Sequence, residues 1–389
     1  MPGVTYDQLM RAPTIMRTVQ QIHNPGNTLQ RFYGLGPMSN PMQTIRGRVG
    51  VYDIFNGTRS LAPSRAPMTG PTRINRKPVG QGTITVMRTY TALAIEDEYV
   101  FATRPLGGQF GEVDEMGRGY IARQLAYAKS LHENNHEFMA SRMFAGGWGL
   151  RTDGENMNLV ATASGTDISV SMQVPAAHTG QLAVGSGGAN VIGTSWATSN
   201  ADLIAQLMQL QHYAAKVNGR RLKHIWVNGN TGQYLFKNSV IQAVGGSVYR
   251  IFDTLNPNTE ITEGQKFPDT GVSVVFRGLP DYTFHIYNQG YVSAGTGESF
   301  SAQTGANWTP FIPDNVAIIT PDPGDWCGLV AGSEPVQYSL KEQPRIQTGF
   351  GMGVDREIDP PRYDLKMLNN AAPALFEPYA CYYATVIGF

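Results

Sequence analysis

The sequence predicts an α+β protein with more than one folding unit. Three observations carry this prediction. A strongly helical stretch at 112–144 and a second one at 200–218 are separated and followed by short alternating strands. With 389 residues, the chain is long enough to divide into two or three units. No internal repeat is visible.

Residues 1–45 are predicted to form an N-terminal arm. Proline, glycine and asparagine punctuate this segment, and only 6–19 has a helical spacing of apolar residues. The first 36 residues contain too few regularly spaced apolar side chains to fold alone. We therefore expect the arm to become ordered only against neighbouring chains.

Residues 46–104 are predicted to form a long β-hairpin. Two β-rich limbs, 48–55 and 83–90, enclose a connection at 56–81 that is rich in Pro, Gly, Arg and Thr. A connection of this length without structure of its own is uncommon inside a compact domain. We expect it to project from the fold and to be covered by another molecule.

The next unit, 105–195, is predicted to contain the longest helix, at 112–144. Its apolar residues recur at spacings of three, four or seven, and Gly146 with Gly147 provides a C-terminal stop. At about 1.5 Å per residue this helix is roughly 50 Å long. The first turn carries acids, which the helix dipole favours: Glu112, Asp114 and Glu115.

A β-hairpin at 159–174 and a Gly/Ser-rich linker at 179–193 are expected to follow. The third unit, 196–334, begins with the helix at 200–218, where Ser199 and Asp202 match a capping box and Gly219 is the stop. Its remaining elements are a short helix and four strands: 232–239, 224–228, 272–276, 283–287 and 316–320. The tail, 335–389, is β-like and returns to the second unit.

The composition indicates a surface that meets other protein. Charged residues make up 15% of the chain, against about 25% in average soluble domains. The 44 Gly and 24 Pro indicate many turns, and 30 basic residues balance 30 acidic ones, so the formal net charge is zero. Such a chain is poorly protected against association. Composition alone is equally compatible with a Gly-rich soluble enzyme.

The charge is unevenly distributed. Residues 1–90 contain eleven basic residues and only two acids, Asp7 and Asp53, so this part is near +9 and the remainder near −9. Such asymmetry suggests contact with nucleic acid or with an acidic neighbouring surface. Regular interleaving of aromatic residues is missing, so we expect sequence-independent phosphate contact at most.

No targeting signal is readable, because no apolar run follows the first basic residues. Nothing approaches the roughly 18 consecutive apolar residues of a membrane span, and we expect synthesis in the cytoplasm. The two cysteines, Cys327 and Cys381, lack metal-ligand spacing. We interpret them as reduced, partly buried thiols.

One motif suggests an enzyme. His132-Glu133-Asn134-Asn135-His136 places two histidines one helical turn apart with a glutamate beside them, as in zinc hydrolases. However, Asn134 stands where such helices usually carry an apolar residue, and Glu137 stands where they usually carry an uncharged one. A third ligand, Glu155, would lie beyond a glycine-rich break. We interpret this stretch as the polar part of a long surface helix, with no metal, cofactor or catalytic residue. The glycine-rich stretches 107–111 and 185–188 lack the residues of a phosphate-binding loop and are predicted to be turns.

The order of elements resembles the HK97-like capsid fold. In that fold an N-terminal arm, an extended β-hairpin E-loop, a P-domain with a long spine helix and β-sheet, and an A-domain follow one another. Local sequence is similar to the lambda-like major capsid proteins of tailed bacteriophages. The segments that carry this similarity are 104–112, Trp196 with 200–204, Tyr287 with 311–314 and 316–320, 359–361 and 373–386.

This resemblance implies a structural protein of the virion, synthesised in the host cytoplasm. It implies self-assembly into hexamers and pentamers of an icosahedral shell around double-stranded DNA, together with scaffolding, portal and decoration proteins. A non-viral compartment shell of the same fold remains an alternative. We also expect contacts between subunits through the basic loop and the acidic helix start: Arg73, Arg76 and Lys77 against Glu112, Asp114 and Glu115.

Overall fold

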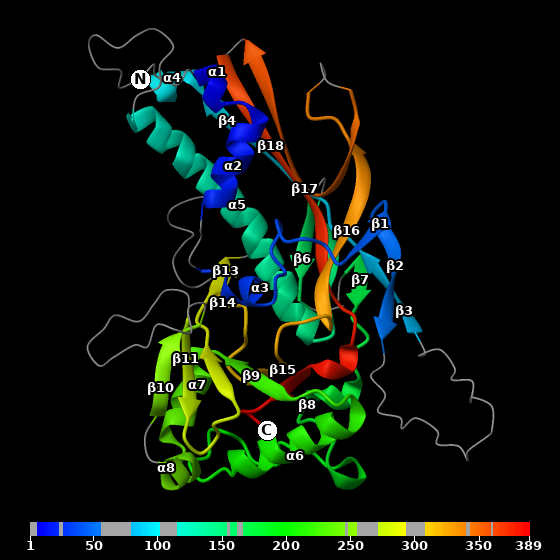
Figure 1. Cartoon of the computed structure of the whole chain (residues 1–389), viewed down its shortest axis with the longest axis vertical. Helices are drawn as coiled ribbons and strands as arrows, with labels where there is room; N and C mark the ends of the chain where they lie inside the picture. Colours follow the sequence, from blue (N-terminus) through cyan, green and yellow to red (C-terminus); the bar gives the residue numbers. More distant parts are fainter. Residues whose placement is uncertain are drawn as a thin grey trace, which may run out of the picture.

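In the computed structural model the molecule is elongated, and two β-sheets lie one above the other along its length (Figure 1). A long helix runs obliquely beside the upper sheet, and shorter helices cover the outer face of the lower sheet. The residues that the structure describes are 6–22, 26–55, 79–101, 115–153, 156–161, 166–245, 248–254, 271–292, 308–339, 343–358 and 361–389.

The upper sheet has five strands in the order β1-β16-β17-β18-β4. β17 and β18 form a long antiparallel pair, and β16 pairs with both of them. Helix α5 (Glu115–Phe144) packs along β18 and β4, so the predicted long helix is confirmed. The strands are β1 (Gln43–Arg46), β4 (Thr89–Glu96), β16 (Cys327–Val336), β17 (Arg345–Ile358) and β18 (Pro361–Leu375). The short helix α4 (Asp97–Phe101) follows β4.

The lower sheet has seven strands in the order β10-β11-β12-β9-β15-β19-β8. Its strands are β8 (Thr179–Gly180), β9 (Leu222–Val227), β10 (Val248–Asp253), β11 (Val272–Phe276), β12 (Thr283–Ile286), β15 (Val316–Pro321) and β19 (Tyr382–Thr385). Three helices accompany it: α6 (Leu203–Val217), α7 (Gly229–Lys237) and α8 (Ser239–Gly245). The helix and strands predicted between 200 and 320 are therefore present.

The start of α6 differs from the predicted capping box. Asp202 is the N-cap, and its side chain accepts a hydrogen bond from the backbone N–H of Ala205. The helix thus begins three residues later than the Ser199 cap would require. At the other end Gly219 has a φ of 73°, the left-handed conformation expected of a helix stop.

Two strands lie in a different sheet from the one that the predicted unit boundaries imply. β16 begins at Cys327, before the expected boundary at 334, and belongs to the upper sheet. β19 lies in the expected tail but pairs with β15 in the lower sheet. The chain therefore crosses between the sheets at 322–326 and again at 376–381.

Smaller sheets complete the fold. β2 (Val49–Phe55) and β3 (Val79–Thr85) form an antiparallel hairpin, and β13 (Gly290–Val292) pairs with β14 (Trp308–Pro310). In the part of the chain that the structure describes, short 3₁₀ turns lie at Ala176–His178, Ser186–Gly188 and Pro378–Ala380.

The hairpin predicted at 159–174 is wrong. β6 (Asn156–Val160) and β7 (Ile168–Ser171) both pair with β5 (Gly147–Asp153), which lies between them. Gly147 makes this arrangement possible, because it has a φ of 136° and a Cβ there would lie 1.9 Å from the carbonyl oxygen of Val170.

The expectation that the arm has no packing within its own chain is also wrong. Helices α1 (Tyr6–Leu9) and α2 (Ala12–Gln21) lie against α5 and the upper sheet (Figure 1), and α3 (Thr28–Phe32) joins the central core. The residues that anchor the arm are buried: Tyr6, Met10, Ile15, Val19, Leu29, Tyr33 and Leu35. The helical spacing at 6–19 is readable in the sequence, but it does not show which part of the chain covers the apolar side of that segment.

Candidate functional site

The charged contact predicted between subunits lies almost entirely outside the described residues. Arg73, Arg76 and Lys77 fall within 56–78, and Glu112 and Asp114 fall within 102–114. Glu115 is the first residue of α5, but its side chain is outside the described part. This contact therefore stays a prediction.

The hairpin β2–β3 presents two different faces. On one face Tyr52, Ile54 and Ile84 are buried, and Gly82 leaves room for the Tyr52 ring, because a Cβ there would lie 2.6 Å from it. This face packs on the body, with the Tyr52 and Phe376 rings 5.9 Å apart.

The opposite face of the hairpin is exposed and carries three apolar side chains, with Asp53 between the second and the third. Val49, Val51 and Phe55 are 65, 48 and 37% exposed, and they alternate along β2 so that all three point away from the body. A strip of this kind marks a surface that another protein covers. The alternation within 48–55 is readable in the sequence, but which of its two faces is buried is not.

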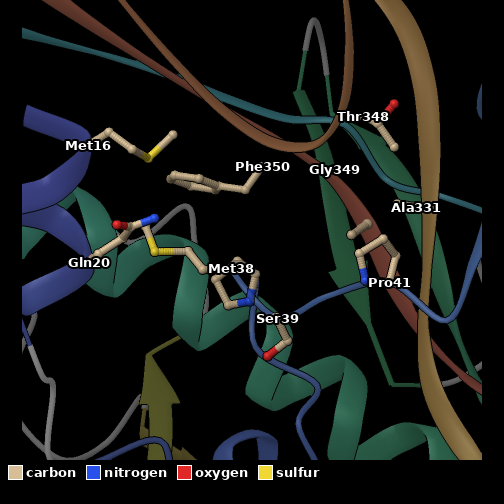
Figure 2. A pocket seen from close by; sticks show the side chains of 11 residues that line it. Met16, Gln20, Met38, Ser39, Pro41, Ala331, Thr348, Gly349 and Phe350 are labelled. Atoms are coloured by element: carbon tan, nitrogen blue, oxygen red, sulfur yellow. The ribbon is translucent and has the colours of Figure 1, made fainter. Parts of the chain in front are cut away.

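A shallow cavity of about 160 Å³ lies between the arm and the upper sheet (Figure 2). Met16 and Gln20 of α2 line it on one side and Thr348 and Phe350 of β17 on the other, with the loop 37–41 below. This volume is smaller than the roughly 300–1,000 Å³ of typical cofactor sites. We interpret it as a packing gap beneath the arm.

The polar stretch of α5 does not lie on the surface, contrary to the sequence interpretation. His132, Glu133 and His136 are all buried beneath the arm and the upper sheet. The helix is covered on this side by chain segments that lie about 100 residues earlier in the sequence, so its own pattern could not reveal the burial.

Both histidines make hydrogen bonds, and those of His136 occupy both of its ring nitrogens. His136 donates from Nδ1 to the carbonyl oxygen of Leu35 at 2.8 Å, and its Nε2 accepts from the Asn369 amide. The Nε2 of His132 lies 2.9 Å from the Thr91 hydroxyl. Burial lowers the pKa of each histidine to about 4, so both are neutral. Within the described residues no group of three His, Cys, Asp or Glu side chains could hold a metal.

Lys129, one turn before this stretch, holds the end of α2. Its ammonium donates to the carbonyl oxygens of Val19, at 2.8 Å, and Ile22. It also pairs with Glu133 at 3.5 Å, and both side chains are less than 10% exposed. Burial lowers the pKa of Lys129 and the Glu133 carboxylate raises it. A cation therefore fixes the arm through its backbone.

Glu137 holds α3 in a similar way. Its two carboxyl oxygens accept from the backbone N–H groups of Leu29 and Gln30, both at 2.8 Å, at the start of α3. The Tyr287 hydroxyl also contacts this carboxyl. Burial raises the pKa of Glu137 to about 7, although these hydrogen bonds oppose the shift.

Beyond α3, the arm reaches the lower sheet. The Trp226 indole N–H donates to the Tyr33 hydroxyl at 2.9 Å, and that hydroxyl also contacts Thr320. The Phe32 ring packs edge-on against Trp226, with centroids 5.2 Å apart. Residues 26–36 therefore join the long helix to the lower sheet.

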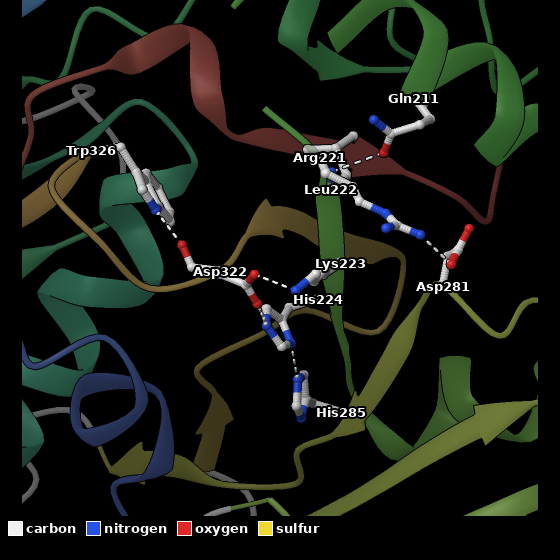
Figure 3. Close-up of polar contacts among 9 residues, drawn as sticks. All are labelled: Gln211, Arg221, Leu222, Lys223, His224, Asp281, His285, Asp322 and Trp326. Carbon is white, nitrogen blue, oxygen red and sulfur yellow. Dashed lines mark hydrogen bonds and ion pairs between the residues drawn. The ribbon is translucent and has the colours of Figure 1, made fainter. Parts of the chain in front are cut away.

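A second polar cluster lies where the lower sheet meets the first crossing (Figure 3). His224 bridges His285, at 2.9 Å, and Asp322, at 3.0 Å, and the Lys223 ammonium pairs with the same carboxylate. His285 in turn contacts the Ser273 hydroxyl at 2.6 Å.

This Ser–His–His–Asp series superficially resembles the polar chains of hydrolases. Ser273 and His285, however, are almost completely buried, so no substrate can reach the hydroxyl. Burial lowers the pKa of both histidines, most strongly for His285. The cluster therefore serves to fix β9, β12 and the 322–326 crossing.

Both cysteines are free thiols, as predicted, and both are completely rather than partly buried. Burial raises the pKa of the Cys327 thiol, and that of Cys381 to about 12. None of the helices in the described ranges combines the length and the apolar character needed to span a membrane.

Two solved structures share this fold over the whole chain. One is a phage-related protein from Bordetella bronchiseptica RB50, and the other is a prophage protein from E. coli CFT073 assigned as a capsid protein. Each has a TM-score of 0.51 and 10% sequence identity, with 100% of this chain covered and 99 and 100% of the respective partner. The molecule therefore has the mixed α+β, HK97-like fold of phage capsid proteins.

The sequence itself matches a family model, phage major capsid protein E, over residues 12–381. The chain belongs to this family. It is thus a structural protein and not an enzyme, and it assembles with copies of itself into the capsid shell of the virion. No curated protein sequence matches it.

Proposed function

We propose that this chain forms the hexamers and pentamers of an icosahedral shell that encloses double-stranded DNA. The exposed apolar side chains of β2 are the observation that carries this proposal, because Val49, Val51 and Phe55 are 65, 48 and 37% exposed in a single subunit. A neighbouring subunit in a ring would cover them.

The subdivision of the fold follows the HK97-like plan and, within it, the lambda-like major capsid proteins. Residues 1–45 are the N-terminal arm, 46–104 the E-loop, 105–195 the P-domain with its spine helix, 196–334 the A-domain and 335–389 the segment that returns to the P-domain. The pairing of the hairpin, the long helix and the two sheets support this plan. Two strands depart from these bounds, because β16 starts before residue 335 but lies in the upper sheet, and β19 comes after it but lies in the lower sheet.

Charge supports two further contacts in the shell. The basic loop meets the acidic start of the long helix in the neighbouring subunit, and excess basic charge in the first 90 residues faces DNA without reading its sequence. The residues of the first contact are Arg73, Arg76 and Lys77 with Glu112, Asp114 and Glu115.

Other proteins complete the assembly. A scaffolding protein guides the shell, a portal protein occupies one vertex and decoration proteins can bind outside. Family membership favours packaged DNA over the alternative of a non-viral compartment with protein cargo.

The test replaces Val49, Val51 and Phe55 together by Thr, which keeps the strand propensity but removes the apolar strip. We expect a folded subunit by circular dichroism and a strong loss of shells by light scattering and negative-stain microscopy. A matched control changes Gln81→Asn and Thr83→Ser, two exposed polar positions of the hairpin, and should assemble normally. Normal shells from the triple variant would refute the hairpin contact, and wild-type protein that stays monodisperse at about 42 kDa would refute shell formation.

A further inference from the structure

The two strands of the hairpin β2–β3 come from opposite edges of the upper sheet. Among the described strands, β1 forms one edge of that sheet and leads into β2, and β4 forms the other edge and follows β3. The connecting segments are 47–48 and 86–88, and we call them the hairpin root. From the root the hairpin runs along the side of the molecule toward the lower sheet (Figure 1). The direction of the hairpin is therefore set where its root lies on the upper sheet.

The backbone of the root rests on β16. The N–H of Gly47 donates to the carbonyl oxygen of Ser333 at 2.9 Å, and the N–H of Val86 donates to that of Arg48 at 2.7 Å. Gly47 has a φ of 78°, a left-handed conformation that suits glycine, where the chain turns from β1 into β2. Gly332 provides the space for this turn, because a Cβ there would lie 2.5 Å from the carbonyl oxygen of Gly47. The two segments of the root are thus joined to each other and to one strand of the sheet.

One carboxylate of β16 contacts a guanidinium from each segment of the root. Arg48 donates from Nε to Oε2 of Glu334 at 3.2 Å. The Nε of Arg88 lies 3.0 Å from the other oxygen, Oε1, as an ion pair without the geometry of a hydrogen bond. The Glu334 side chain is 11% exposed, and those of Arg48 and Arg88 are 51 and 31% exposed. A largely buried negative charge therefore lies between two positive charges that reach it from the two segments.

Without this carboxylate, the two guanidiniums would repel each other. Arg side chains stay charged in proteins, so loss of Glu334 replaces two attractions by one repulsion between Arg48 and Arg88. Separation of the two root segments relieves that repulsion and breaks the hydrogen bond from Val86 to Arg48. Tyr52 and Ile84 still hold the hairpin against the body, but apolar contact is not directional. The direction of the hairpin therefore depends on the charged contact at its root.

We propose that Glu334 positions the hairpin β2–β3 for its contact with a neighbouring subunit, because it fixes both segments of the root on β16. This inference rests on the proposed function, in which the neighbour covers Val49, Val51 and Phe55. Loss of the carboxylate leaves these side chains in place and changes only how firmly the hairpin holds its direction. A surface that is ordered before association loses less conformational entropy on binding. Subunits that keep Glu334 therefore assemble more readily.

The first experiment measures hydrogen exchange of the Gly47 and Val86 amides in free subunits of the whole chain, with and without Glu334→Gln. Gln has nearly the same shape as Glu but no charge. We expect the protection of both amides to fall about tenfold, while the amides of the β17–β18 pair keep theirs. Shell formation, followed by sedimentation, should fall in the same variant. Glu357→Gln is the matched control, because Glu357 pairs with Arg362 at 2.8 Å within the β17–β18 pair, and it should match the wild type in both measurements.

A triple variant separates positioning of the root from general stabilisation of β16. Glu334→Gln combined with Arg48→Gln and Arg88→Gln removes all three charges, so no repulsion remains between the two root segments. Most of the lost protection should return. If Glu334 only stabilised β16, the triple variant would be at least as unprotected as Glu334→Gln alone. Unchanged protection in the single variant, or no recovery in the triple variant, would overturn the proposal.

Shell formation tests the remaining step. A Glu334→Gln subunit that loses protection but forms shells like the wild type would overturn the positioning role. Wild-type protein that forms no shells would refute the proposed function, and exchange in free subunits would still test the contact at Glu334. If Glu334→Gln does not fold, Arg48→Gln at the exposed partner takes its place. This variant should lower the protection of Val86 about threefold, and unchanged protection would overturn the proposal.

Discussion

Replacing Lys129 by Met should release the arm from the body of the free subunit. Met has a similar length but cannot donate to the carbonyl oxygens of Val19 and Ile22, where α2 ends. It also leaves the buried Glu133 without this cation. The change therefore acts on the attachment of α1 and α2 more than on either sheet.

The magnitude follows from burial. Hydrogen bonds to charged groups contribute about 1.5–3 kcal/mol each, and removal of one partner of a buried ion pair costs about 3–5 kcal/mol. These contributions overlap, because the same ammonium makes all three contacts. We expect the free energy of arm attachment to fall by about 3–5 kcal/mol, which raises the detached population by roughly 100-fold or more.

Limited trypsin digestion measures this detachment. Arg11 and Arg17 are exposed but lie beside or within α2, so cleavage there requires local opening. We expect cleavage at Arg11 and Arg17 to be slow in wild-type subunits and rapid in Lys129→Met subunits, with the circular dichroism spectrum of the body nearly unchanged. Lys216→Met is the control, because Lys216 is an exposed lysine on α6, and it should match the wild type.

A double variant, Lys129→Met with Glu133→Leu, separates the two contributions. Replacement of both partners of a buried pair by apolar residues is often nearly neutral. The double variant should recover the part of the attachment free energy that is lost because Glu133 has no cation. It should not recover the part that is lost because the carbonyl groups of Val19 and Ile22 have no donor. Equal resistance of wild type and Lys129→Met would refute the reasoning and show that apolar packing alone holds the arm.

Two further predictions concern the zinc-like motif and the loop charges. Changing His132 and His136 together to Ala should lower the free energy of unfolding in urea by about 2–5 kcal/mol, because their buried partners lose hydrogen bonds. Metal analysis of the wild type should find no zinc. Stoichiometric zinc in the wild type that is lost in the variant would contradict this prediction. Reversing the basic loop charges to Glu should give folded subunits that sediment as shells poorly at low salt, and reversing the acidic helix start to Lys in the same chain should partly restore assembly. Normal shells from the first of these reversals would favour DNA neutralisation as the role of the loop. The reversed residues are Arg73, Arg76 and Lys77, then Glu112, Asp114 and Glu115.

Elements whose partners are local could be predicted from the sequence. The long helix and α6 have apolar spacing and end signals within their own residues, and Gly219 adopts the expected left-handed conformation. The three-stranded sheet could not be predicted, because the central strand β5 starts with the glycines that also end α5. The close approach of Gly147 to Val170 depends on a strand that begins about 20 residues later.

The buried polar contact shows a different limit. The buried polar residues of α5 recur at spacings of three and four, which is the pattern of a single helix face. They are Lys129, His132, Glu133, His136 and Glu137, and all are less than 10% exposed. A polar face normally indicates contact with water, but backbone carbonyl and amide groups can satisfy it equally well. Here most of those groups come from 19–35, a segment whose own apolar residues are too irregular to predict packing. The same spacing therefore predicts a polar helix face, but it does not decide whether water or another chain segment covers that face.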